Sequence, residues 1–265
     1  MKSTDVSLKK ILDVIDALLG PGGCPWDRKQ TPLSLCDYVL EESYELVDAI
    51  RRGSPSEARE ELGDTLFLLL FITALYEKAG NFSLDDVIAE NAAKMIRRHP
   101  HVFDETEITS QEQLLKNWEA IKRKEKEEHE DQGLFSSLPV GLPPLLKAYR
   151  INSKAARVGF TWEHDGQLEE QLHREWQEWL EARASGDVHR QQEEFGDYLF
   201  TLAEYARRHS IKPNSALDFA NLKFQRRFRA MEALAADRNL SLDAMSLEAM
   251  NALWDEVKAE EKGGK

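Results

Sequence analysis

The stretch at residues 41–64 reads EESYELVDAIRRGSPSEAREELGD, and residues 174–197 read REWQEWLEARASGDVHRQQEEFGD in the same register. Two glycine positions recur between them, Gly53 with Gly186 and Gly63 with Gly196. Four acidic positions also recur: Glu42, Glu45, Glu61 and Asp64 correspond to Glu175, Glu178, Glu194 and Asp197. Two acidic clusters in one register indicate a duplicated unit that is built around carboxylates.

The spacing of the acids predicts that each set converges on one space. Residues three apart on a helix share a face, so Glu42 projects with Glu45, and Glu61 with Asp64. Two helices packed antiparallel across the Gly53 turn would bring both pairs together. Because like charges at close range repel, we expect a Mg²⁺ ion, or Mn²⁺ as a substitute, between their oxygens.

The glycine in each acid set is costly inside a helix. Glycine costs about 1 kcal/mol relative to alanine there, yet it stands at both Gly63 and Gly196. The repeat predicts the close approach of a neighbouring backbone or of a ligand at this position.

Two other interpretations of the acids stay open at this point. Glutamates with this spacing are commonly the solvated faces of surface helices. A di-iron carboxylate bundle would need two Glu-x-x-His motifs. The sequence offers one, Glu170 to His173, without a counterpart in the first half.

Helical periodicity extends along almost the whole chain and predicts an all-α fold. No segment alternates convincingly as a strand. We expect a first domain at 1–130, a linker at 131–145 and a second domain at 146–265, each small enough to need completion by pairing between the units or across a homodimer. The expected helices include 8–19, 32–52, 56–78, a helix that begins at the N-cap Ser83, and 167–184.

Charge and composition exclude several classes of protein. The 265 residues carry a formal charge of −13, which disfavours non-specific binding to nucleic acid or to anionic membranes. The most apolar run, Leu66 to Tyr76, is too short to span a bilayer. The two cysteines, Cys24 and Cys36, provide no disulfide framework and are interpreted as buried or inert thiols. These features fit a soluble cytoplasmic protein.

A basic face and a tryptophan follow each acid set. The basic residues have identical internal spacing and suit phosphate oxygens through charge-assisted hydrogen bonds, although solvated faces have the same pattern: Lys94, Arg97 and Arg98, then Lys223, Arg226 and Arg227. Trp118 and Trp254 are candidates for stacking on a nucleobase, with core packing as the alternative. Arg190 is a further candidate for substrate binding.

Several motifs together resemble the two-domain MazG-type nucleoside triphosphate pyrophosphohydrolases over nearly the whole chain. They include Gly23-Cys24-Pro25-Trp26-Asp27, Glu61-Leu62-Gly63-Asp64, the segment RRHPHVF at 97–103, VGFTW at 158–162 and KFQRRF at 223–228. The resemblance implies an all-α fold, a homodimer with helices shared across the interface, and Mg²⁺-dependent cleavage of nucleoside triphosphates between the α and β phosphates.

The family pattern Glu-Glu-x-x-Glu with Glu-x-x-Asp is complete in the first copy, where it begins at Glu41. In the second copy Arg174 stands in place of that first glutamate. The sequence does not decide which copy is active, so both acid sets are candidate metal ligands, and Glu42 and Glu175 are candidate catalytic bases. The preferred nucleotide also stays open, and the alternative is a non-catalytic helical dimer that binds nucleotides or a protein.

Overall fold

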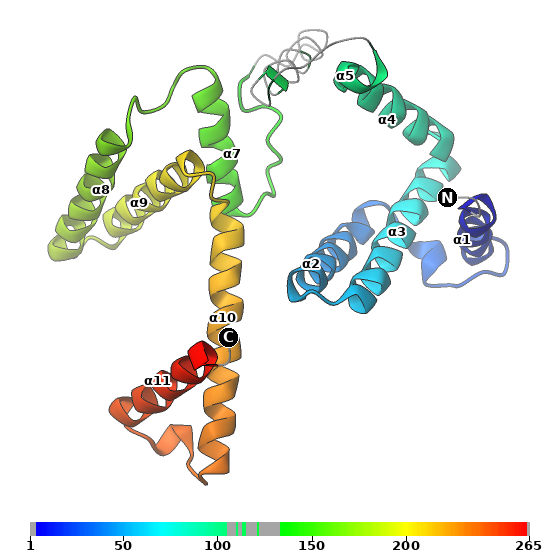
Figure 1. The fold of residues 1–265 in the computed structure, drawn as a ribbon. Helices are drawn as coiled ribbons and strands as arrows, with labels where there is room; N and C mark the ends of the chain where they lie inside the picture. The colour runs from blue at the N-terminus through cyan, green and yellow to red at the C-terminus, as the bar shows by residue number, and fades with distance from the viewer. Residues whose placement is uncertain (1–3, 105–109, 111–112, 115–120, 122–132, 264–265) are drawn as a thin grey trace. The chain divides into compact units, whose positions relative to one another are not determined.

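The protein is all-helical in the part of the chain that the structure describes (Figure 1). The structure is a computed structural model, and it describes residues 4–104, 110, 113–114, 121 and 133–263. No strand occurs among these residues, as the sequence predicts. The chain divides into two compact units, residues 1–129 and 130–265. The charged segment 122–131 lies outside the described residues.

The described residues of the first unit form four longer helices and three short ones. Their bounds are α1 (Thr4–Leu19), η1 (Asp27–Lys29), η2 (Leu33–Leu35), α2 (Cys36–Arg52), α3 (Pro55–Lys78), α4 (Leu84–Arg98) and α5 (Pro100–Phe103).

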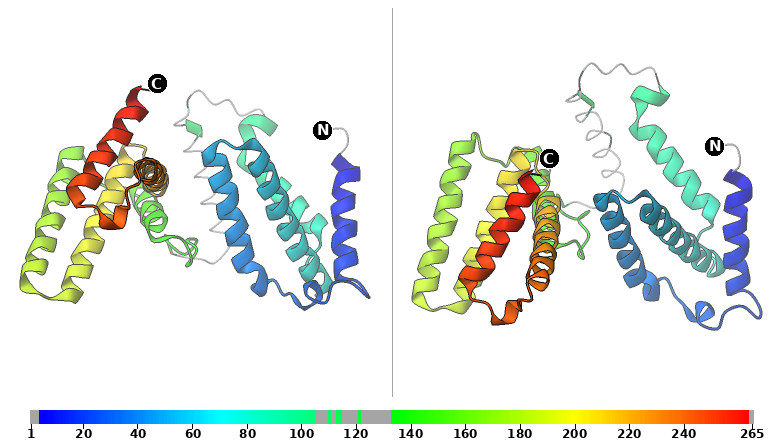
Figure 2. Two further views of the ribbon diagram at one scale, coloured as in Figure 1. Left: turned by 90° about the horizontal axis from the view of Figure 1, so that it is seen from below. Right: turned by 60° about the horizontal axis from the view of Figure 1, so that its bottom comes forward.

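The second unit, over its described residues, contains five longer helices and one short one. Their bounds are α7 (Pro144–Arg157), α8 (Asp165–Ser185), α9 (Val188–Arg208), α10 (Pro213–Asp237), η3 (Leu242–Ala244) and α11 (Leu247–Gly263). Within the units, α2 lies beside α3 and α8 lies beside α9, as the two views in Figure 2 also show.

The helix boundaries follow local signals in the sequence. Gly53 and Gly186 end α2 and α8 in the left-handed region, at φ of 69° and 76°, which a residue without Cβ adopts at little cost. Ser83 caps α4 in a capping box with Asp86, which confirms the predicted helix start. The predicted helix 32–52 instead begins as a 3₁₀ turn over Leu33–Leu35.

The core of the first unit forms between α1, η2 and α3. Its buried residues are Ile15, Leu19, Leu35, Leu70 and Phe71. Phe67 packs on Phe71 with ring centroids 5.6 Å apart. This core fixes α3, and α3 in turn carries half of the first acid set.

The second unit has one core between α10 and α11 and further buried residues on α7, α8 and α9. Met231, Ala235, Leu253 and Val257 form a core between α10 and α11. On α9, by contrast, Glu204 is only 5% exposed, and it accepts two hydrogen bonds from Arg207, at 2.6 and 2.8 Å. Thr161 also donates to Glu204, at 3.0 Å, so an ion pair lies where an apolar side chain would be expected.

Two sequence-based expectations need correction or refinement. Cys36 is exposed and Cys24 is partly exposed, so neither is a buried thiol, and the alternative of inert thiols stays a prediction. Gly63 and Gly196 have no atom of a neighbouring element within 4 Å of the position that a Cβ would occupy. The expected close approach of a neighbouring backbone is therefore not found within the described chain, while the open space leaves room for a ligand.

No helix in the described part of the chain is both long and apolar enough to cross a membrane.

Candidate metal and nucleotide site

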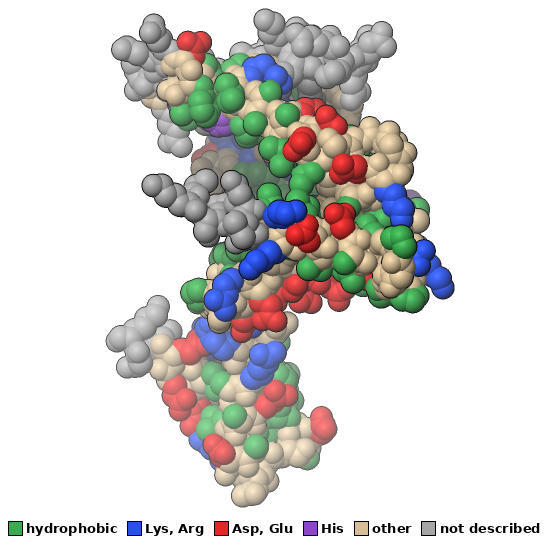
Figure 3. All heavy atoms as spheres, turned by 90° about the vertical axis from the view of Figure 1, so that its right-hand side faces the viewer, with side chains coloured by type: hydrophobic (Ala, Val, Ile, Leu, Met, Phe, Trp, Pro, Cys, Tyr) green, Lys and Arg blue, Asp and Glu red, His purple; other side chains and the backbone are tan. Residues whose placement is uncertain are grey.

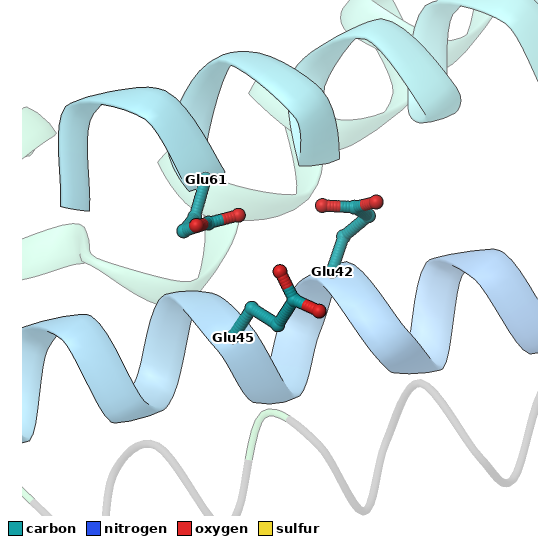
Figure 4. A group of neighbouring side chains, drawn as sticks. All are labelled: Glu42, Glu45 and Glu61. Carbon is teal, nitrogen blue, oxygen red and sulfur yellow. The ribbon is translucent and has the colours of Figure 1, made fainter. Parts of the chain in front are cut away.

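The first acid set gathers where α2 lies beside α3. One oxygen each of Glu42, Glu45 and Glu61 lies within 4.8 Å of the others. Figure 4 shows the two glutamates of α2 and the single glutamate of α3 directed into the space between these helices. Asp64 lies one turn after Glu61 on α3 and is exposed, so three of the four predicted acids form the closest group.

The electrostatics of this group favour a bound cation. Burial raises the pKa of Glu42 above its ordinary value, and repulsion from Asp64, Glu45, Glu61 and Glu41 raises it further. All of these causes raise the pKa of Glu42, so the ionised form of this carboxyl group is disfavoured in the cluster. A divalent cation would relieve the repulsion directly.

The pKa of Glu61 is raised as well. The largest cause is burial, followed by repulsion from Glu45, Glu60 and Asp64, while a hydrogen bond with Glu42 opposes the shift. Glu42 of α2 and Glu61 of α3 therefore cannot both ionise without a cost in free energy.

The second acid set gathers where α8 lies beside α9, but with different members. Here Glu175, Glu194 and Asp197 bring one oxygen each within 4.8 Å of the others. Glu178 is exposed on α8 and lines a surface hollow together with Arg174. The spacing thus predicts both clusters correctly, but it does not tell which acid of each set stays outside.

Two residues beside the second set are polar partners of its acids and differ in type from the corresponding residues of the first copy. The side-chain amide of Gln171 donates to Glu175 Oε1 at 2.6 Å, and Arg190 Nε lies 3.3 Å from Glu194 Oε1. The corresponding first-copy positions hold Tyr38 and Glu57. Gln171 is not among the site residues predicted from the sequence, although it stands four residues before Glu175 on the same helix, and this i, i+4 spacing is a usable signal.

The basic residues are placed apart from the closest carboxylates. Lys94, Arg97 and Arg98 lie in the second half of α4, which follows the C-terminal end of α3 (Figure 1). In the second unit, Arg226 and Arg227 of α10 both contact Glu261 of α11, at 3.0 and 2.8 Å.

The structure describes one of the two candidate tryptophans. Trp254 packs against Phe224 with ring centroids 5.1 Å apart and borders the core between α10 and α11. Trp118 lies outside the described residues. Lys223 is exposed on α10.

The donor chemistry of the acid sets fits a hard divalent ion. Mg²⁺ takes oxygen ligands at about 2.0–2.1 Å in octahedral geometry, which places adjacent ligand oxygens about 3 Å apart. Small side-chain rotations would bring oxygens within 4.8 Å to that spacing. The fold and these clusters define an all-α protein with two carboxylate clusters, each between a pair of helices, that are consistent with metal binding.

Comparison with known proteins identifies the family to which the chain belongs. Residues 30–103 match the MazG nucleotide pyrophosphohydrolase domain. A nucleoside triphosphate pyrophosphohydrolase of Escherichia coli (strain K12) is 37% identical over 257 residues, which are 96% of this chain and 98% of that protein. The nucleoside triphosphate pyrophosphohydrolase/pyrophosphatase MazG of Thermotoga maritima is 36% identical over 97% of this chain and 98% of its own length. The chain therefore belongs to the MazG family of nucleotide pyrophosphohydrolases.

One solved structure also aligns with part of the chain. The crystal structure of a mazG-related protein from Thermotoga maritima covers 43% of this chain and 98% of its own length, at 27% identity and a TM-score of 0.39.

Proposed function

We propose that the protein hydrolyses nucleoside triphosphates between the α and β phosphates, which yields a nucleoside monophosphate and pyrophosphate. The observation that carries this proposal is the convergence of Glu42, Glu45 and Glu61 from two adjacent helices. Membership of the MazG family, with relatives of that activity along nearly the full chain, supports the reaction class.

We propose Mg²⁺ as the metal, with Mn²⁺ as a substitute. In the first copy Glu42, Glu45 and Glu61 would hold it, with Asp64 one turn further along α3. When bound, the ion would neutralise charge on the triphosphate oxygens and lower the pKa of a coordinated water.

The side chains of the protein would carry out proton removal and the stabilisation of the leaving group. Glu42 is the candidate general base, since it belongs to the group that would hold the ion and therefore lies beside the water that the ion would coordinate. A water molecule that loses its proton to Glu42 attacks the α-phosphorus, and the bond to the bridging oxygen of the β-phosphate breaks. Basic residues such as Lys94, Arg97 and Arg98 would stabilise the pyrophosphate that leaves.

We further propose a homodimer that covers an apolar face of the first unit. Leu40, Tyr44 and Val47 on α2 and Leu62, Leu66 and Leu69 on α3 repeat at i, i+4 and i+7, and each is at least 39% exposed. On the side that Figure 3 turns to the viewer, which is the right-hand side of Figure 1, hydrophobic side chains are interspersed with acidic and basic ones. Apolar surface of this regularity commonly marks an interface.

The dimer is tested by light scattering after size-exclusion chromatography. The variant L66E should shift the mass from dimer to monomer, whereas the variant L247E, at a leucine of α11 that is 71% exposed and stands in no such row, serves as the control. A wild-type protein that is monomeric at micromolar concentration would contradict the proposal.

The reaction is tested by product analysis in ¹⁸O-labelled water. Incubation with several nucleoside triphosphates and Mg²⁺ should give a monophosphate that carries one ¹⁸O and an unlabelled pyrophosphate, because water attacks the α-phosphorus. A diphosphate with inorganic phosphate, or label in the pyrophosphate, would contradict the assigned bond. No turnover would favour a non-catalytic nucleotide-binding protein.

A further inference from the structure

The helices α8 and α9 are joined to one another at one end only. Gly186 ends α8, and α9 begins two residues later at Val188. The second acid set lies in the middle of this pair, with Glu175 midway along α8 and Asp197 midway along α9. At the far end, where α8 begins and α9 ends, no turn connects the two helices directly, so side chains have to fix their spacing there.

Two side chains of α9 bind the first turns of α8 and the residue before them. Arg208 donates from Nε to Asp165 Oδ1 and from Nη1 to the backbone carbonyl of Trp162, both at 2.7 Å. The Tyr205 hydroxyl donates to Glu169 Oε1 at 3.1 Å. Only 19% of the Arg208 side chain is exposed, and its hydrogen bond lowers the pKa of the Asp165 carboxyl. This pair is therefore charged at neutral pH and partly shielded from water.

A second layer of polar contacts holds the loop that precedes α8. Glu204 of α9 is 5% exposed and accepts hydrogen bonds from both Arg207 and Thr161. Arg207 Nη2 also lies 3.3 Å from Thr161 Oγ1. Because Thr161 belongs to the loop, the loop and the first turns of α8 are both bound to the last turns of α9.

The first copy closes the same end of its helix pair with apolar side chains. The residues of α3 that correspond to Glu204, Tyr205, Arg207 and Arg208 are Phe71, Ile72, Ala74 and Leu75. All four belong to the core between α1, η2 and α3 or pack against it. Apolar packing is not directional, whereas a hydrogen bond requires a short distance and a favourable angle. The contacts of Arg208 therefore specify where α8 begins along α9, and not only that the two helices touch.

A displacement of α8 at this end would reach the acid set. Asp165 and Glu175 lie on one helix, about 15 Å apart at a rise of about 1.5 Å per residue. One oxygen each of Glu175, Glu194 and Asp197 lies within 4.8 Å of the others. Mg²⁺ requires nearly ideal octahedral geometry, and ligands displaced by more than about 0.5 Å lose that geometry. The register of α8 against α9 therefore affects how well this set binds an ion.

We propose that Arg208 and Tyr205 are positioning residues for the second acid set, because they hold α8 in the register that keeps Glu175 beside Glu194 and Asp197. The proposal rests on the metal-dependent function proposed above. Both residues act through the position of Glu175 and not on the ion itself. The ligand geometry at the middle of the helix pair thus depends on contacts at its open end.

The test measures Mn²⁺ affinity by electron paramagnetic resonance, which detects the free ion, on the full chain that carries E42Q/E45Q/E61Q. In this background the bound ion reports on the second set. Adding R208A should lower the affinity about tenfold, as the loss of residues that orient metal ligands does. Removal of a positive charge would by itself raise the affinity for a cation. The direction of the change therefore separates positioning from electrostatics.

Further variants make the test specific. The variant Y205F removes a single hydroxyl and should lower the affinity about threefold, which keeps the proposal testable if R208A does not fold. The variant R208K keeps the charge and should recover part of the loss. The variant R229A removes the same charge from an exposed position of α10 and should not lower the affinity. The loss caused by R208A should shrink when E175Q is already present, since the two residues act together.

Circular dichroism at the temperature of the titration identifies the variants that are folded. An affinity that is unchanged or raised in folded R208A and Y205F would overturn the inference and leave the proposed function intact. The same holds if the wild type binds Mn²⁺ and the chain with E42Q/E45Q/E61Q does not. Absence of Mn²⁺ from the wild-type chain would contradict the proposed function and the inference together.

Discussion

The two copies of the repeat use the same acid spacing in different surroundings. In the first, repulsion among Glu42, Glu45 and Glu61 contributes to the raised pKa of Glu42. In the second, Glu175 and Glu194 have polar partners from their own helices, Gln171 and Arg190. The difference teaches that the same acid spacing can have different polar neighbours, which the spacing itself does not predict.

The largest expected effect comes from one matched pair of substitutions at corresponding positions. The combined variant E61Q/E194Q should lower kcat for nucleoside triphosphate hydrolysis about 1000-fold or more, equivalent to about 4 kcal/mol, because each acid set loses a ligand charge. The single variants E61Q and E194Q should show which set carries the activity, since the loss follows the set that does the work. Steady-state kinetics with circular dichroism as a folding control would measure the losses, and an unchanged kcat in all three variants would contradict the carboxylate assignment.

The second comparison concerns stability at one register position of α3 and α9. Phe71, 2% exposed, corresponds to Glu204, 5% exposed. The variant F71A should cost about 3–4 kcal/mol, since it leaves a cavity. The variant E204A should cost about 1–3 kcal/mol, since it leaves Arg207 and Thr161 without their acceptor.

Urea unfolding monitored in both units would measure these costs. A loss for E204A that exceeds the loss for F71A would show that the ion pair, and not the apolar core, is the stronger support of its helix.

Magnesium should protect each pair of helices whose acid set binds it. At about 100 times its dissociation constant, Mg²⁺ adds about 2.7 kcal/mol to the state that binds it. Amide hydrogen exchange should therefore slow by up to about 100-fold in α2 and α3, in α8 and α9, or in both pairs. The effect should vanish from α2 and α3 in E61Q and from α8 and α9 in E194Q, and a lack of protection in all four helices would contradict the proposed metal sites.

The smallest expected effect concerns Glu261, which links α10 and α11. Hydrogen bonds from Arg227 and Arg226 hold its pKa below the ordinary 4.5. Since the folded state binds this proton less readily than the unfolded state, the ion pair stabilises above pH 4.5, and that gain is lost as pH falls through the lowered pKa.

The variant E261Q should therefore be slightly less stable than the wild type at pH 7, and the difference should shrink as pH falls below 4.5 and through the lowered pKa. Urea titrations at pH 7 and at successively lower pH measure the difference, with E232Q as the exposed control on α10. A difference that persists undiminished at the lower pH would contradict the assigned pairing.

The sequence predicts the helices and the acid clusters well because both depend on local spacing. Three-residue spacing places Glu42 with Glu45, and Gly53 returns the chain so that Glu61 faces them. It does not predict that Asp64 or Glu178 stays outside its cluster, since that depends on helix rotation and side-chain conformation. Long-range pairs such as Arg227 with Glu261 leave no periodic signal at all.

The central claim is that carboxylates gathered between paired helices bind a divalent ion. The most direct measurement is anomalous diffraction from a crystal of the full chain soaked in Mn²⁺. The account predicts a peak about 2.1 Å from carboxylate oxygens of at least one acid set, either Glu42, Glu45 and Glu61 or Glu175, Glu194 and Asp197. The absence of a peak at both sets would contradict it.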